Sequence, residues 1–228
     1  MTRALLGLAA LSLTMSPTLA SAREPARGYA NPSAVVAAEI AFAKMAQEKG
    51  QWTAFRATAS KDAVMFVPQI VATQDWLKGK ADPAKAVAWQ VHQVWSSCDG
   101  SLAVTRGAWQ GEGGTSGYFT TVWQRQKDGK YKWIADQGEP LPMALDAPEM
   151  IVAKVADCPP GYRGKPPRQA KMVAAPLDPA RRGGKSLDGT LTWDAAVATD
   201  GARRFVVTMA SGGQPVTVQD LQVEAPTK

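Results

Sequence analysis

The sequence predicts an α+β fold in which N-terminal helices are followed by a long antiparallel sheet. Residues 31–60 carry helix-type apolar spacing, and from Val87 onward apolar and polar side chains alternate with a period of two. Asp99-Gly100 and Asp128-Gly129 each separate two alternating runs, and Asp-Gly favours a two-residue hairpin turn. A curved sheet folded over the helices is therefore expected to leave a cone-shaped hollow.

The first 22 residues have the pattern of a secretory signal. Arg3 gives a positive start, residues 4–13 are apolar, Pro17 breaks the run, and Ala20-Ser21-Ala22 offers a cleavage site. An uncleaved anchor is the alternative, although the apolar run is short for a membrane span. The pattern predicts a secreted, periplasmic protein without stable membrane insertion.

The first helix is expected to begin at Asn31-Pro32, because Asn is a good N-cap and Pro suits the first turn, and to end near Gly50. Its apolar stripe is expected on one face, and a second short helix is expected over residues 51–60. The expected stripe consists of Val36, Ile40, Ala43 and Gln47.

The sheet is expected to begin after these helices, with one short helix interrupting it at residues 75–80. Its strands are predicted at residues 63–67, 87–98, 101–110, 117–127 and 130–137. The cone domain as a whole is expected over residues 33–146.

The C-terminal third differs in composition. Residues 159–190 are rich in Pro and Gly and predict a linker, and residues 191–228 predict a small three-stranded meander. Three strands are marginally stable alone, so this extension is expected to dock on the cone or on a partner. No internal repeat is predicted.

The predicted linker also carries most of the positive charge. It contains seven basic residues against Asp178 and Asp188, and the basic ones are Arg163, Lys165, Arg168, Lys171, Arg181, Arg182 and Lys185. Such a stretch binds nucleic acid or acidic membranes in some proteins, or is simply a solvated linker. Export argues against nucleic acid, and the solvated linker is preferred.

The two cysteines, Cys98 and Cys158, are expected to form a disulfide in an oxidising compartment, with two free buried thiols as the alternative. Their spacing does not suit zinc or a redox C-x-x-C site, and His92 is the single histidine. No metal site and no cofactor are therefore predicted.

Several stretches resemble the DUF4440-type branch of the NTF2-like (SnoaL-like) superfamily across about residues 33–140. The matching stretches are Glu39–Ala43, Ala54-Phe55, Asp62–Pro68, Asp99–Trp109 and Gly117–Trp133. The resemblance implies a cone with a cavity between sheet and helices and a homodimer formed through the sheet. It implies little about function, because this fold hosts isomerases, cyclases, dehydratases and non-catalytic binders.

Strict alternation around the two Asp-Gly turns predicts which side chains line the cavity. Trp95 is expected opposite Val104 and Gln93 opposite Arg106, on the more apolar face and therefore inside the cone. The predicted cavity residues are Trp89, Gln93, Trp95, Arg106, Phe119, Trp123 and Asp136.

Asp136 is the main candidate for chemistry, as a general base whose pKa burial would raise. A structural ion pair between Asp136 and Arg106 is the alternative and is preferred, since buried charges are usually paired. Tyr118 and His92 are weaker catalytic candidates.

Three functions remain open at this point. The preferred one is binding of a small, largely apolar molecule in the cone without turnover. The second is an acid–base enzyme of the isomerase or lyase type that uses Asp136. The third is an envelope interaction module that acts through the C-terminal extension.

Overall fold

The computed structural model describes residues 30–164 and 176–225 of the chain. The predicted signal at residues 1–22 and part of the predicted linker lie outside the described residues.

Two consecutive helices form the N-terminal layer. In α1 (Pro32–Lys49), the amide of Ala34 donates to Asn31 Oδ1 at 3.1 Å, so Asn31 caps the helix as predicted. Gly50, with a φ of 104°, ends α1 and allows the sharp turn into α2 (Gln51–Thr58).

The buried face of α1 differs from the predicted stripe by one position. Its buried residues are Val35, Glu39, Phe42 and Ala46, whereas Ile40 is 56% exposed. The prediction of Val36, Ile40, Ala43 and Gln47 was wrong because the buried face of the helix includes the acid Glu39, which apolar spacing alone does not select.

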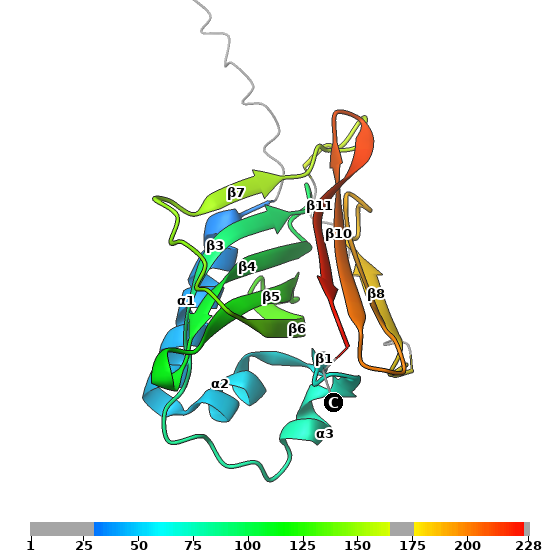
Figure 1. The fold of residues 1–228 in the computed structure, drawn as a ribbon. Coiled ribbons are helices and arrows are strands. Elements are labelled where there is room, and N and C mark those ends of the chain that lie inside the picture. Colours follow the sequence, from blue (N-terminus) through cyan, green and yellow to red (C-terminus); the bar gives the residue numbers. More distant parts are fainter. Residues whose placement is uncertain (1–29, 165–175, 226–228) are drawn as a thin grey trace, which may run out of the picture.

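A seven-stranded sheet curves over these helices (Figure 1). Neighbouring strands run in the order β2-β1-β6-β5-β4-β3-β7, antiparallel except for the pairs β1–β6 and β3–β7. The short helix α3 (Thr73–Leu77) follows β2, and a short 3₁₀ turn, η1 (Glu112–Gly114), precedes β5. The strands are β1 (Ala59–Phe66), β2 (Ile70–Ala72), β3 (Ala88–Ser96), β4 (Leu102–Gln110), β5 (Ser116–Arg125), β6 (Tyr131–Leu141) and β7 (Val152–Val155).

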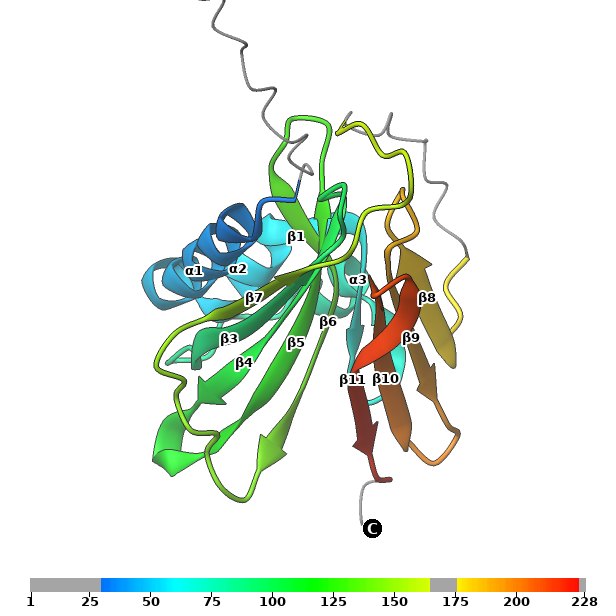
Figure 2. The same ribbon diagram turned by 90° about the horizontal axis from the view of Figure 1, so that it is seen from above.

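A second sheet covers the opposite face of the first. It has four strands in the order β11-β10-β9-β8, so that the curved sheet lies between the helices and this layer (Figure 2). Its strands are β8 (Arg181–Lys185), β9 (Leu191–Val197), β10 (Arg203–Ser211) and β11 (Gln214–Val223). The extension therefore docks on the cone. It also contains one strand, β8, that falls within the predicted linker.

Two β-bulges set which side chains face which layer. The β3–β4 register is interrupted between Val91 and Gln93, and the β5–β6 register passes over Ile134. Each bulge inserts one residue, so the side chains beyond it change faces. The prediction that side chains alternate strictly through residue 92 of β3 was therefore wrong.

The first sheet consequently has two buried faces. One apolar cluster joins it to the helices and includes Phe42, Phe55, Trp123 and Trp133. The other joins it to the second sheet, and there Trp95, Leu102, Val104 and Val122 meet residues such as Trp193 and Phe205. The homodimer expected through the sheet would need this second face, which the chain covers with its own C-terminal strands.

The two sheets are tied together by a pair of matching turns. Ser97–Leu102 and Ser186–Leu191 both read S-x-D-G-[S/T]-L, so a short internal repeat is present although none was predicted. The Asp99 amide donates to Asp188 Oδ2 at 2.9 Å, and the Asp188 amide donates back to Asp99 Oδ2 at 3.0 Å. A second reciprocal pair follows: the Cys98 amide donates to Thr190 Oγ1, and the Leu187 amide donates to Ser101 Oγ.

The predicted disulfide between Cys98 and Cys158 is present, with Cα atoms 5.1 Å apart. It joins the first of these turns to the segment after β7. The disulfide closes a loop with a sequence separation of 60 residues and so constrains the same junction covalently.

Candidate functional site

The cone contains a pocket of about 260 Å³ between the helices and the concave face of the first sheet. Most of its wall is aromatic or aliphatic, and a few polar side chains interrupt that wall. The lining residues are Glu39, Phe42, Gln51, Phe55, Val87, Trp89, Trp109, Phe119, Thr121, Asp136, Gln137 and Gly138.

Glu39 of α1 is the most deeply buried acid of the pocket, with 1% of its surface exposed. Its Oε1 accepts from Trp89 Nε1 at 2.9 Å, and its Oε2 accepts from Thr105 Oγ1 at 2.6 Å and from Trp123 Nε1 at 2.9 Å. Burial raises the pKa of Glu39, while these three hydrogen bonds act in the opposite direction. Each donor is neutral, so the carboxyl is held in place without a counter-ion.

Asp136 of β6 lies across the pocket from α1 and is only half-buried. Its Oδ2 accepts from Thr121 Oγ1 on the neighbouring strand at 2.7 Å. Burial raises the pKa of Asp136 to about 7; the hydrogen bond from Thr121 lowers it, and the charge of Glu39 raises it further. Near neutral pH this carboxyl therefore exists in both protonation states.

The two acids differ in what they can do chemically. Glu39 has both oxygens engaged by protein donors, which suits a structural group. Among the described residues, Asp136 forms no ion pair and accepts one side-chain hydrogen bond, from the hydroxyl of Thr121. Asp136 is therefore the group that can exchange a proton or a hydrogen bond with a molecule in the pocket.

Three of the predicted cavity residues line this pocket, namely Trp89, Phe119 and Asp136. A fourth, Trp123, lies in the helix-side core, where its indole donates to Glu39.

The other three predicted cavity residues lie elsewhere. Trp95 is in the core between the two sheets, opposite Val104 as predicted. Arg106 pairs in register with Gln93, and its guanidinium lies over the Tyr118 ring at 5.3 Å. The apolar face was assigned to the cone because it was expected to be the single buried face, but the second sheet buries it instead.

This placement also removes the predicted ion pair between Arg106 and Asp136, since the structure puts Arg106 with Tyr118 and Asp136 with Thr121. Tyr118 is not part of the pocket wall, and burial raises its pKa. Burial and the charge of Arg106 lower the pKa of His92, which also lies outside the wall.

The most important residue that sequence reasoning missed is Glu39. It lies on the same helical face as Val35, Phe42 and Ala46, and an acid in an apolar stripe is the signal that could have identified it. Thr121 and Trp109 were also not selected, although both line the pocket.

Within residues 30–164 and 176–225, no group of three or more His, Cys, Asp or Glu side chains is placed to hold a metal ion. Among the described helices, none combines the length and the apolar character needed to cross a membrane.

No protein-family model matches the sequence, and no curated protein matches it. Solved structures do match. A ketosteroid isomerase-like protein from Erwinia carotovora atroseptica is 14% identical with a TM-score of 0.39, over 49% of this chain and 97% of its own. An NTF2-like protein of unknown function from Shewanella baltica is 16% identical with a TM-score of 0.38, over 49% and 94%. These likenesses concern the fold of about half of this chain.

Proposed function

We propose that this protein binds a small, largely apolar molecule in the pocket of the cone. The observation that carries the proposal is an aromatic pocket of about 260 Å³ that contains one accessible, readily protonated carboxyl group, Asp136. Apolar walls with a few placed polar groups are typical of small-molecule sites.

The two acids also restrict the charge of the ligand. An anion would be repelled by Asp136 and Glu39, whose interaction already raises the pKa of Asp136. A neutral molecule with one hydroxyl or carbonyl group fits best, because Asp136 can donate to it when protonated and accept from it when ionised.

The neutral fluorescent probe N-phenyl-1-naphthylamine tests this proposal. Its emission is expected to rise on titration with the protein and to fall again when Val87→Trp fills the pocket wall. Val216→Trp is the matched control, because Val216 is 43% exposed on the second sheet. Equal emission with both variants would show that the probe binds outside the cone and would contradict the proposal.

A second function, acid–base catalysis, is favoured by the pKa of Asp136, since a base with a pKa near 7 is well matched to proton transfer at neutral pH. In this function, ionised Asp136 removes a proton from carbon next to a carbonyl group. The protonated Asp136 then returns it at the same or a neighbouring position.

Exchange of the α-protons of cyclohexanone in D₂O, followed by NMR, tests the catalytic function. The rate is expected to rise with pH through about 7, since the ionised carboxyl is the base. Asp136→Asn is expected to reduce it by about 100-fold or more. A wild-type rate equal to that of buffer would reject this ketone chemistry and leave the binding proposal standing.

A further inference from the structure

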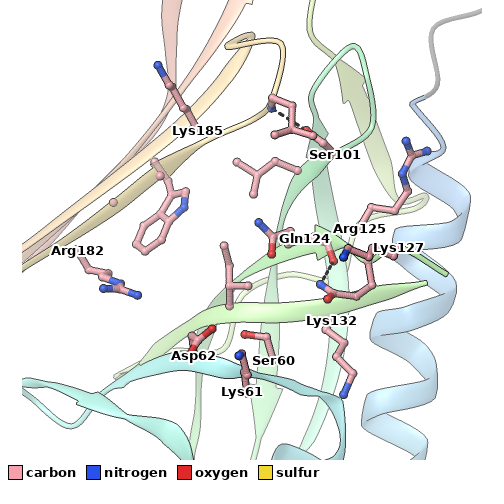
Figure 3. Close-up of a pocket in the computed structure, with 17 residues that line it drawn as sticks. Ser60, Lys61, Asp62, Ser101, Gln124, Arg125, Lys127, Lys132, Arg182 and Lys185 are labelled. Carbon is pink, nitrogen blue, oxygen red and sulfur yellow. Dashed lines mark hydrogen bonds between the residues drawn. The ribbon is translucent and has the colours of Figure 1, made fainter. Parts of the chain in front are cut away.

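A second and larger hollow, the intersheet cleft, lies where the edges of the two sheets diverge. It has a volume of about 540 Å³, and residues of β1, β5, β6 and the β3–β4 turn form one wall while residues of β8 and β9 form the other (Figure 3). It is separate from the cone pocket, whose walls are the helices and the opposite face of the first sheet.

The cleft is strongly cationic. Among the described lining residues, Asp62 is the single acid and six are basic: Lys61, Arg125, Lys127, Lys132, Arg182 and Lys185. They come from both sheets, and Arg182 extends from the second sheet toward the first (Figure 3). Because these positive charges surround one hollow, they raise the local concentration of anions there.

Several of these lysines have no acidic partner among the described residues. Within the described residues, none of Lys61, Lys127 and Lys185 forms an ion pair. Lys132 donates to the backbone oxygen of Ala59 at 3.2 Å, which holds its positive charge at the edge of β1 without neutralising it. Among the described residues, these four lysines are therefore not neutralised by ion pairs.

The deeper part of the cleft is apolar and contains one unmatched donor. Leu102 and Trp193 line it and are 2% and 4% exposed. The indole nitrogen of Trp193 is buried with no acceptor in the part of the chain that the structure describes. A Cβ atom at Gly184 would lie 2.9 Å from that nitrogen, so glycine keeps this edge of the indole free of a side chain.

We propose that the intersheet cleft binds a compact polyanion, a small molecule that carries two or more phosphate or carboxylate groups. Arg182 supplies a planar fork that matches either group, and the lysines supply point charges around it. Such a molecule is a soluble anion or the headgroup of an anionic lipid, and the two sources share this chemistry. The proposal also gives a role to Arg182 and Lys185 of β8, two of the seven basic residues in the predicted linker.

The test measures binding of tripolyphosphate and citrate to the full chain by calorimetry at about 0.1 M salt, where charges beyond about 10 Å are screened. The triple variant Lys61→Gln, Lys127→Gln, Arg182→Gln is expected to weaken binding by about tenfold or more. The control variant Lys49→Gln, Lys78→Gln, Lys85→Gln removes the same charge from exposed sites outside the cleft wall and is expected to change affinity by less than about threefold. Circular dichroism checks that both variants fold.

Co-sedimentation with vesicles of phosphatidylcholine and phosphatidylglycerol distinguishes the source of the anion. If the triple variant at Lys61, Lys127 and Arg182 loses vesicle binding and the control variant keeps it, the cleft binds a lipid headgroup. If the protein binds the free anions but not the vesicles, the cleft binds a soluble molecule. Absence of binding by all three probes, or equal weakening in the two triple variants, would overturn the proposal. Either result leaves the cone pocket untouched, because no residue changed here lines it.

Discussion

The two faces of the seven-stranded sheet bury their charges differently. On the helix side, Glu39 and Asp136 are two acids held by neutral donors around a pocket. On the side of the second sheet, the buried Arg203 forms an ion pair with Glu139 at the margin of a core of aliphatic and aromatic side chains. The core between the two sheets is therefore closed by apolar packing and an ion pair, and its open space lies at the sheet edges, whereas the helix side keeps an acid without an ion pair next to its pocket.

The largest expected effect tests the cohesion of the second layer. Phe205 is 3% exposed, and its ring stacks on Trp193 with centroids 5.6 Å apart. Phe205→Ala is expected to lower the free energy of unfolding by about 3–5 kcal/mol, because it removes buried area and leaves a cavity. Urea unfolding measures this loss, with the exposed Val216→Ala as control. A loss below about 1 kcal/mol would mean that the two layers are only loosely packed.

An intermediate effect is expected on the helix side and depends on pH. The pKa of Asp136 is about 7 in the folded chain against an ordinary value of 3.8, so between these values the folded chain holds a proton that the unfolded chain releases. The contribution of Asp136 to stability therefore falls as pH rises from about 4 to about 7, by up to about 4 kcal/mol.

Asp136→Asn removes this penalty. The variant is expected to be more stable than the wild type by about 1–4 kcal/mol at pH 8 and to differ little from it at pH 4. Urea unfolding at several pH values checks this difference, and Asp62→Asn serves as an exposed control. A stability difference that does not change with pH would show that Asp136 does not titrate in this range.

The smallest expected effect concerns the paired turns that join the two sheets. Ser101 Oγ accepts from the Leu187 amide at 2.9 Å. Ser101→Ala leaves that amide without this acceptor and is expected to cost about 1 kcal/mol. Unfolding measurements on Ser101→Ala and on Thr190→Val, which removes the matching acceptor of the Cys98 amide, are expected to give similar losses. A loss for only one of them would break the equivalence of the two turns.

Local sequence signals were sufficient for most of the helices and strands up to β6. Asn31-Pro32 and Gly50 bounded α1, and both Asp-Gly pairs lie in turns between the expected strands. The docking of the second sheet was less predictable, because β8 contains Gly183-Gly184 and lies in a stretch rich in Pro and Gly. Its pairing with β9 comes from long-range packing that no local propensity reports.

The site was harder to predict than the fold, for two physical reasons. A bulge inserts one residue into a strand, and the one between Val91 and Gln93 moved Trp95 to the face opposite Trp89. A sheet buried on both faces also loses the contrast between apolar and polar sides, so the more apolar face did not identify the cone. Counting from the Asp128-Gly129 turn places Thr121 opposite Asp136, and the structure has this pair. The bulge at Ile134 shifts the register only between this pair and the turn, so Asp136 was assigned to the correct face.

The proposed function depends on an acid in the cone that is protonated and ionised in comparable amounts at neutral pH, so the pKa of Asp136 should be measured itself. The carboxyl carbon signals of a chain labelled with ¹³C-aspartate are followed by NMR as the pH is changed, and Asp136→Asn identifies the signal. We expect a midpoint at about 7. A midpoint near the ordinary value of 3.8 would show that Asp136 is solvated or paired with a cation, and would contradict this account of the pocket.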